Sequence, residues 1–145
     1  MTPKEKNFSE WRAEKLGYVY FSRLNDLIIK EIDDLPGDLF DYLIDIGENQ
    51  KQTGRYFVVE VKAIDSSKKM KYLPKGYKNI PMPALLVLFD NRTDRGYYKW
   101  IKKPAENGAL TYNNPKKQEM EELNNNSLVR IVTEIKDWYS GRAIA

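Results

Sequence analysis

Residues 39–64 read LFDYLIDIGENQKQTGRYFVVEVKAI, and this stretch limits the folds that the chain can adopt. Two apolar runs, 40–46 and 55–63, flank a polar, glycine-containing loop, which is the pattern of two strands joined as a hairpin. Residues two apart on a strand point to the same face, so Glu60 and Lys62 project side by side from the second run. The stretch therefore predicts an antiparallel hairpin with a charged pair on one face.

Other segments extend this hairpin into a larger sheet. An amphipathic helix over about 9–24 is predicted by a stripe of apolar residues at helical spacing, Ala13, Leu16, Tyr20 and Leu24. Residues 85–89 are continuously apolar, as in a central strand buried on both faces, so a strand is predicted over 85–90, and 97–101 predicts another strand. A helical stripe over 128–139, capped by Ser127, predicts a C-terminal helix. The expected fold class is α/β (α+β), with a mixed central sheet flanked by an N-terminal and a C-terminal helix.

Some segments leave their structure open. The apolar residues 27–29 fit either a short strand or a helical turn. A polar stretch from Asn114 is expected to be helical and to break at the asparagines 124–126, and 90–96 is expected to be a hairpin turn. Three aromatic residues could either pack in the core or at the sheet edge, or form an aromatic dimer surface: Tyr97, Tyr98 and Trp100.

Composition restricts the chemistry. The 145 residues suit one domain, and a hydrophobic content of 41% supports a core. The chain has no cysteine, which excludes disulfides and zinc–thiolate sites, and no histidine, which excludes serine–histidine and cysteine–histidine catalysis. Carboxylates, lysines, tyrosines or a metal held by oxygen atoms remain. The net charge of +3 is compatible with nucleic-acid binding but does not require it.

Hydropathy indicates where the chain acts. No apolar run is long enough to cross a bilayer, and the first residues, MTPKEKNFSEW, do not resemble a secretory leader. A cytoplasmic location without a membrane partner is therefore expected.

Acidic residues on the two predicted strands suggest a metal site. A buried carboxylate beside an ammonium group is costly unless it is compensated, and a divalent ion on Asp41 and Glu60, beside Lys62, would compensate it. Oxygen ligands suit Mg²⁺ or Mn²⁺. Asp45 lies two pleats from Asp41 on the same face and is a further candidate ligand. The alternative is a solvent-facing Glu60–Lys62 ion pair contributing only ~0.2–1 kcal/mol.

The order of these residues resembles a known nuclease family. The relevant pieces are RAE at 12–14, DYLI at 41–44, EVK at 60–62 and PALLVLFD at 83–90. An aspartate opening a strand, a hairpin and Glu-x-Lys at the end of the next strand resemble the PD-(D/E)XK nuclease superfamily. The likeness is to small restriction-endonuclease-like domains of unknown function found in bacterial defence islands, and it spans about residues 14–104.

The resemblance implies one restriction-endonuclease-like domain over 1–145 that hydrolyses DNA phosphodiesters with Mg²⁺ or Mn²⁺. It assigns Asp41 and Glu60 as metal ligands and Lys62 as the catalytic lysine. It also makes Glu14 a helix-borne candidate ligand, with a solvated helix residue as the alternative. Lys62 would orient the attacking water or contact the scissile phosphate, or transfer a proton if burial lowered its pKa. Anti-phage defence or DNA processing, as a homodimer or as a subunit of a larger complex, is implied by the resemblance alone.

A lysine-rich segment follows the predicted site. Lysines neutralise phosphates and the tyrosines among them can stack on bases, so the segment is a candidate nucleic-acid contact, with an ordinary solvated loop as the alternative. A non-catalytic nuclease-like protein that binds a protein partner or nucleic acid is the rival function, and RNA is as compatible with the sequence as DNA. The lysines are Lys68, Lys69, Lys71, Lys75 and Lys78.

Overall fold

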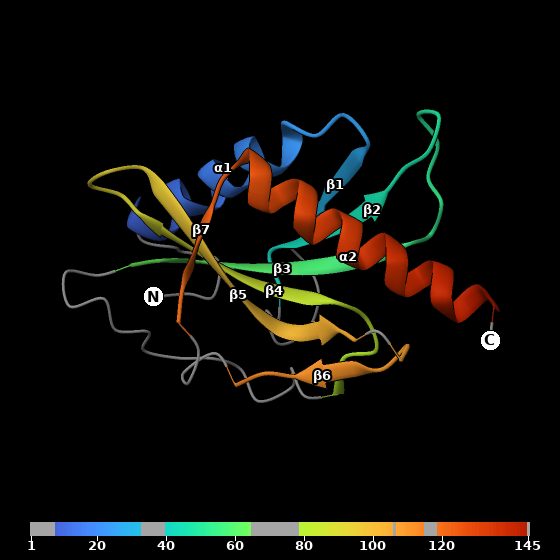
Figure 1. The fold of residues 1–145 in the computed structure, drawn as a ribbon. Coiled ribbons are helices and arrows are strands. Elements are labelled where there is room, and N and C mark those ends of the chain that lie inside the picture. The colour runs from blue at the N-terminus through green and yellow to red at the C-terminus, as the bar shows by residue number, and fades with distance from the viewer. Residues whose placement is uncertain (1–7, 33–39, 65–78, 106, 115–118, 145) are drawn as a thin grey trace.

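The computed structural model describes residues 8–32, 40–64, 79–105, 107–114 and 119–144. In these ranges a helix opens the chain, strands follow, and a second helix ends it (Figure 1). The elements are α1 (Phe8–Ser22), β1 (Leu27–Glu31), β2 (Tyr42–Ile46), β3 (Tyr56–Ala63), β4 (Ala84–Asp90), β5 (Arg95–Pro104), β6 (Leu110–Tyr112), β7 (Glu121–Leu123) and α2 (Asn125–Ile144).

The described strands form one seven-stranded mixed sheet in the order β1-β2-β3-β4-β5-β6, and β7 also pairs with β5. β1, β2 and β3 are consecutively antiparallel, β3 and β4 are parallel, and β5 is antiparallel to β4. The register places Tyr42 opposite Val59 and Lys62 opposite Leu88. The predicted fold class is therefore confirmed: a mixed sheet containing an antiparallel hairpin, with one helix at each end of the chain.

Both helices pack on the same face of the sheet (Figure 1). Alternate residues of β3, such as Val59 and Val61, point to this face and join its core. The buried residues that the helices contribute are Ala13 and Phe21 from α1, and Leu128, Ile131, Val132 and Ile135 from α2.

The opposite face of the sheet is also apolar around β4. All seven residues of β4 are buried, which confirms the central strand predicted for 85–90. Glu60 and Lys62 belong to this second face because they alternate along β3 with Val59 and Val61. The buried apolar residues on this face are Phe40, Val58, Ala84, Leu86, Leu88 and Ile101.

The buried side of α1 is rotated relative to the predicted stripe. Its fully buried positions are Ala13, Gly17 and Phe21, whereas Leu16 and Tyr20 lie at the edge of the core. A Cβ atom at Gly17 would lie 3.1 Å from Val61 Cγ2, so the glycine lets α1 approach β3 closely. Because of this rotation, Glu10, which lies three residues before Ala13, points toward the sheet.

The C-terminal helix is present as predicted, but the predicted cap is wrong by three residues. The Ser127 N–H donates to Asn124 Oδ1 at 2.9 Å, and the Asn124 N–H donates to Ser127 Oγ at 2.8 Å. Asn124 is therefore the N-cap and Ser127 its reciprocal partner at the third helical position. No helix in the described part of the chain is long and apolar enough to span a membrane.

The structure shows which elements form in the segments that the sequence left undecided. β1 shows that 27–29 is part of a strand, and the turn predicted for 90–96 joins β4 to β5. The helix expected after Asn114 is wrong for residues 121–123, which pair with β5 as β7. A three-residue strand has no periodic signal, and only its distant pairing partner determines it.

The aromatic residues of β5 belong mainly to the core. Tyr98 and Trp100 are 3% and 7% exposed, while Tyr97 on the other face is half-buried. Tyr98 and Trp100 therefore pack inside the fold, which leaves little of either ring to form a dimer surface.

Candidate functional site

Asp41 immediately precedes β2 and bridges to β3. Its backbone N–H donates to the Val59 carbonyl at 2.9 Å, and its Oδ2 accepts a hydrogen bond from the Val61 N–H at 2.7 Å. Val59 and Val61 are the chain neighbours of Glu60. The structure therefore brings the two predicted ligands, Asp41 and Glu60, onto adjoining backbone segments.

Glu60 and Lys62 form an ion pair beside the second apolar face. Lys62 Nζ lies 3.2 Å from Glu60 Oε1. The Glu60 side chain is 5% exposed and that of Lys62 is 31% exposed, so the pair is not the solvent-facing one of the alternative interpretation. Because a charged group in an apolar environment needs compensation, the Lys62 ammonium stabilises the buried Glu60 carboxylate at this position.

A third carboxylate, which sequence reasoning missed, comes from α1. Both carboxylate oxygens of Glu10 lie 3.4 Å from the Ala63 N–H, at the end of β3. Glu10 shares a helix face with Ala13 and Gly17, which lie three and seven residues further on. The spacing of Glu10 from Ala13 and Gly17 could have indicated that Glu10 faces the sheet. The predicted stripe through Leu16 placed a different side of the helix against the sheet.

The surrounding charges hold Lys62 in its protonated form. Partial burial lowers its pKa, but the charge and hydrogen bond of Glu60, followed by the charges of Glu10 and Asp41, raise it, and the net pKa is above the ordinary value. Since an unperturbed lysine has a pKa of about 10.4, Lys62 is a cation at neutral pH. The geometry thus favours a charge-bearing hydrogen-bond donor over a proton-transferring base.

Glu14 occupies a different environment from Glu10. Its backbone carbonyl accepts a hydrogen bond from the Tyr42 hydroxyl at 2.6 Å, and burial followed by its negative charge raises the pKa of Tyr42. Its contacts with β2 are therefore on the helix-bearing side of the sheet, where Tyr42 belongs to the core.

Asp45 is fully buried and organises the loop between β2 and β3. Its Oδ1 accepts the Thr53 N–H and its Oδ2 accepts the Gly54 N–H, each at 3.0 Å. Asp45 lies opposite Tyr56 in the sheet. Tyr56 is four residues before Glu60, so Asp45 is ~13 Å from the level of Glu60 along β3. The structure does not bring Asp45 to the other carboxylates, and its bonds explain its burial.

Replacing Asp45 should therefore affect stability more than catalysis. Asp45→Ala leaves the Thr53 and Gly54 N–H groups without their acceptor and should lower the free energy of unfolding by ~2–3 kcal/mol. Asp45→Asn keeps one acceptor oxygen and should lose about half as much. Urea unfolding measures both values, and equal stability of the three proteins would show that the loop is held by other contacts.

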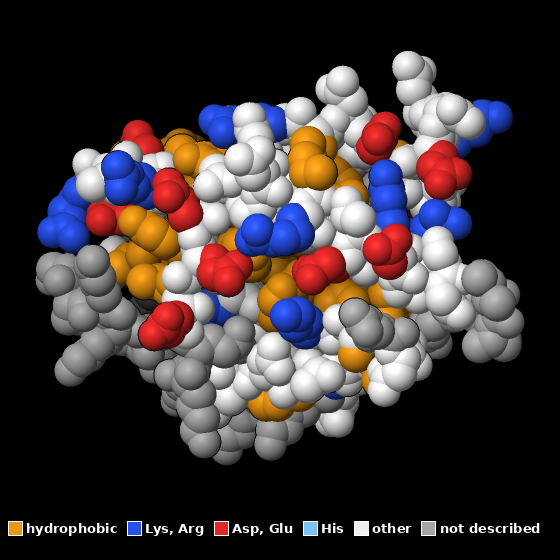
Figure 2. Space-filling model, in the orientation of Figure 1, with side chains coloured by type: hydrophobic (Ala, Val, Ile, Leu, Met, Phe, Trp, Pro, Cys, Tyr) orange, Lys and Arg blue, Asp and Glu red, His pale blue; other side chains and the backbone are white. Residues whose placement is uncertain are grey.

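The predicted nucleic-acid contacts cannot be placed on this framework. Lys68, Lys69, Lys71, Lys75 and Lys78 lie outside the described residues. On the face that carries α2, Figure 2 shows positive and negative side chains interspersed among the residues that are coloured. That mixture favours no single sign of ligand charge there, whereas the Glu60–Lys62 pair lies on the opposite side of the sheet.

A polar cavity lies at a different place, between β5, β7 and α2. It has a volume of about 260 Å³, and its lining includes Tyr98, Glu121 and Arg130, which bond to one another. Three basic and three acidic side chains line it, so its charge selects neither anions nor cations. The candidate site is therefore not at this cavity.

Comparisons with protein-family models, with curated proteins and with solved structures find no match to this chain. The functional argument consequently rests on the arrangement of Asp41, Glu60, Glu10 and Lys62.

Proposed function

We propose that this chain is a metal-dependent nuclease that hydrolyses DNA phosphodiester bonds at the Asp41–Glu60–Lys62 site. The observation that carries the proposal is one lysine in the electrostatic field of three carboxylates from separate segments of the fold. Two of those carboxylates also bond to the backbone of β3 on either side of Lys62. A cluster of this kind is expensive for folding alone, which supports a chemical role.

The donor set fits a magnesium or manganese ion. No group of three or more metal-ligating side chains is assembled among the described residues. Mg²⁺ is usually held by only one or two carboxylates, with waters and substrate phosphates completing its shell. Asp41 and Glu60 would supply those carboxylates. When bound, such an ion lowers the pKa of a water molecule and neutralises charge on the phosphate.

The protein side of the chemistry follows from the contacts. Glu60 fixes the Lys62 ammonium through the 3.2 Å ion pair, and the partly exposed side chain of Lys62 reaches the surface. Its donors can hold the attacking water or a phosphate oxygen, where a positive charge stabilises the charge that develops in the transition state. Leu86 lies opposite Glu60 on β4, Val58 is buried on the same face, and the Glu60 side chain is 5% exposed, so little water reaches the carboxylate side of the pair.

The test is cleavage of plasmid and oligonucleotide DNA in Mg²⁺ or Mn²⁺, with and without chelator, beside metal-binding calorimetry. Glu60→Gln should reduce the cleavage rate at least ~10²-fold. Glu48→Gln is the matched control because Glu48 also pairs with a cation, Arg55 at 3.3 Å, but in an exposed loop. Its rate should equal that of the unmodified chain. Absence of both metal binding and cleavage would exclude a nuclease in the isolated chain.

A non-catalytic binding protein is the second candidate, and the outer side of α1 favours it. Phe8, Trp11 and Tyr18 are 74%, 49% and 42% exposed, and such aromatic side chains are typical of binding surfaces. Metal binding without cleavage of DNA or RNA would support this candidate. The cytoplasmic location, a homodimer or larger complex, and a role in defence or DNA processing remain parts of the proposal.

A further inference from the structure

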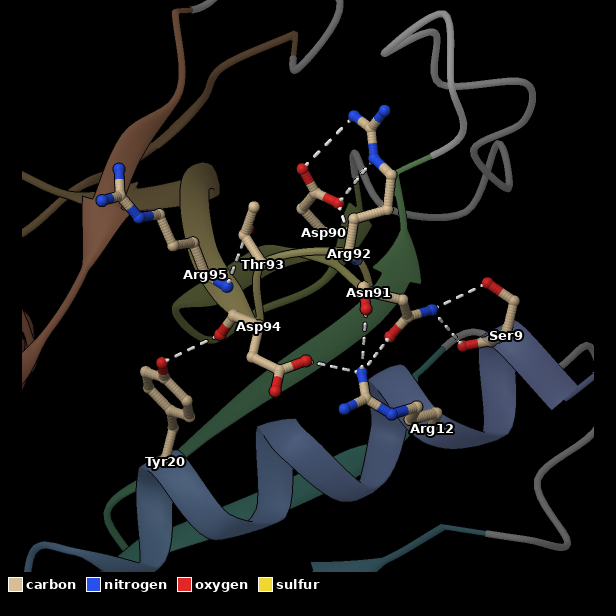
Figure 3. Close-up of polar contacts among 9 residues, drawn as sticks. All are labelled: Ser9, Arg12, Tyr20, Asp90, Asn91, Arg92, Thr93, Asp94 and Arg95. Atoms are coloured by element: carbon tan, nitrogen blue, oxygen red, sulfur yellow. Dashed lines mark hydrogen bonds and ion pairs between the residues drawn. The ribbon is translucent and has the colours of Figure 1, made fainter.

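The turn between β4 and β5 presents two different sides. One side is bound to α1: Arg12 Nη1 lies 2.7 Å from Asp94 Oδ1 and donates to Asn91 Oδ1 at 3.1 Å. Asn91 Nδ2 donates to Ser9 Oγ at 2.8 Å, and the Tyr20 hydroxyl donates to the Asp94 carbonyl at 3.2 Å. Figure 3 shows these contacts holding the turn against the helix. This side needs no ligand to explain its residues.

The other side carries an arginine oriented by a buried aspartate. Asp90 Oδ1 accepts the Arg92 backbone N–H at 2.9 Å and Nε at 3.3 Å, while Oδ2 accepts Nη2 at 3.5 Å. The Asp90 side chain is 12% exposed and that of Arg92 is 66% exposed. A guanidinium has five N–H donors, so Asp90 orients the group without using all of them. Figure 3 shows this pair pointing away from α1.

The strand register places this arginine beside the candidate site. Lys62 lies opposite Leu88 on the parallel strand β4, and the Ile64 N–H donates to the Phe89 carbonyl at 2.8 Å. Leu88 and Asp90 point to the face that carries Lys62, because residues two apart on a strand share a face. Asp90 therefore lies ~7 Å beyond the level of Lys62, toward the carboxyl ends of both strands.

We infer that Arg92 is a substrate-binding residue that contacts a backbone phosphate of the nucleic acid next to the phosphate held at Lys62. This inference rests on the proposed nuclease function. Arginine suits the role because its planar guanidinium remains charged and donates two parallel hydrogen bonds to a phosphate. Asp90 supports the role by fixing the guanidinium before substrate arrives, which reduces the entropy lost on binding.

The experiment compares Arg92→Ala with Arg95→Ala. Each change removes one positive charge, Arg92 from the turn and Arg95 from the start of β5, but the Arg95 side chain points away from Asp90 and Arg92 (Figure 3). Binding of a fluorescent DNA duplex is measured by anisotropy in chelator over a range of salt concentrations, and cleavage is measured at saturating DNA in Mg²⁺. Melting temperatures of all variants are recorded.

Arg92→Ala should weaken DNA binding about tenfold. It should also reduce the slope of log affinity against log salt by ~0.9, the loss of one phosphate contact. Arg92→Lys should keep the salt slope, and Arg95→Ala should match the unmodified chain in both DNA binding and cleavage.

Three results would overturn the inference. If the unmodified chain binds and cleaves DNA but Arg92→Ala and Arg95→Ala have the same salt slope, Arg92 contacts no phosphate and the proposed function stands. If the unmodified chain neither binds nor cleaves DNA, the inference and the proposed function fail together. A binding loss accompanied by a matching fall in melting temperature would assign Arg92 a purely structural role and so also contradict the inference.

Discussion

Lys62→Ala is expected to destabilise the fold and to abolish cleavage, although Lys62 contributes little apolar surface to the core. The substitution leaves Glu60 buried without its ammonium partner at 3.2 Å, and Glu10 and Asp41 add negative charge nearby. Breaking a buried ion pair in this way costs ~3–5 kcal/mol, and the lower end applies because Lys62 is partly exposed. Cleavage should fall at least ~10²-fold.

The pH dependence identifies the cause of that destabilisation. Protonation of Glu60 removes the charge that Lys62 no longer balances, so the folded variant should take up a proton that the unfolded chain, with an ordinary glutamate pKa of ~4.3, has released. The folded state then binds more protons, and its stability falls as pH rises. The deficit relative to the unmodified chain should therefore be small near pH 4 and grow toward pH 8 in urea titrations.

The double variant Glu60→Gln/Lys62→Met is the matched control. It removes both charges and keeps side chains of similar size, so most of the lost stability should return while cleavage remains absent. A Lys62→Ala deficit that is constant with pH would show that the loss comes from packing and not from the broken Glu60–Lys62 ion pair.

Trp138→Ala should produce the other large effect. Trp138 is 4% exposed, its ring lies 4.8 Å from that of Tyr139, and its Nε1 donates to the Gly108 carbonyl at 3.0 Å. Removing a buried indole should lower the free energy of unfolding by ~3–5 kcal/mol. The shift of the urea midpoint, at an unchanged slope, measures this loss.

Two further substitutions separate the contributions of Trp138. Trp138→Phe keeps a ring but leaves the Gly108 carbonyl without its donor, so it should lose ~1–2 kcal/mol. Val129→Ala, on the same helix but 54% exposed, should change stability by less than ~0.5 kcal/mol. If Trp138→Ala behaved like Val129→Ala, α2 would not be part of the cooperative core.

The elements that the sequence predicts well are those with a long local pattern. The β2–β3 hairpin, the apolar run of β4 and the stripe of α2 each carry their pattern within one segment. β6 and β7 are three residues each, and their pairing with β5 depends on the tertiary fold. The same distinction explains α1, whose rotation is set by the close contact between Gly17 and Val61.

The site divides in the same way. Strand alternation was sufficient to place Glu60 beside Lys62, and the paired strands placed Asp41 near them. Alternation also selected Asp45, but it contained no information on the loop N–H groups that use its carboxylate. Glu10 shares a helix face with Ala13 and Gly17, but this spacing alone did not assign it to the site, because its approach to Ala63 depends on how α1 sits on a strand that begins more than forty residues later.

The attachment of α1 to the β4–β5 turn has a consequence for local unfolding. The bonds of Ser9 and Arg12 reach residues about eighty positions away, so the helix and the turn can separate only by breaking the same set of contacts. Such segments exchange their amide hydrogens as one unit with a shared opening free energy. Glu10 leaves the site in any opening of this unit, so the negative potential around Lys62 depends on the closed population of α1.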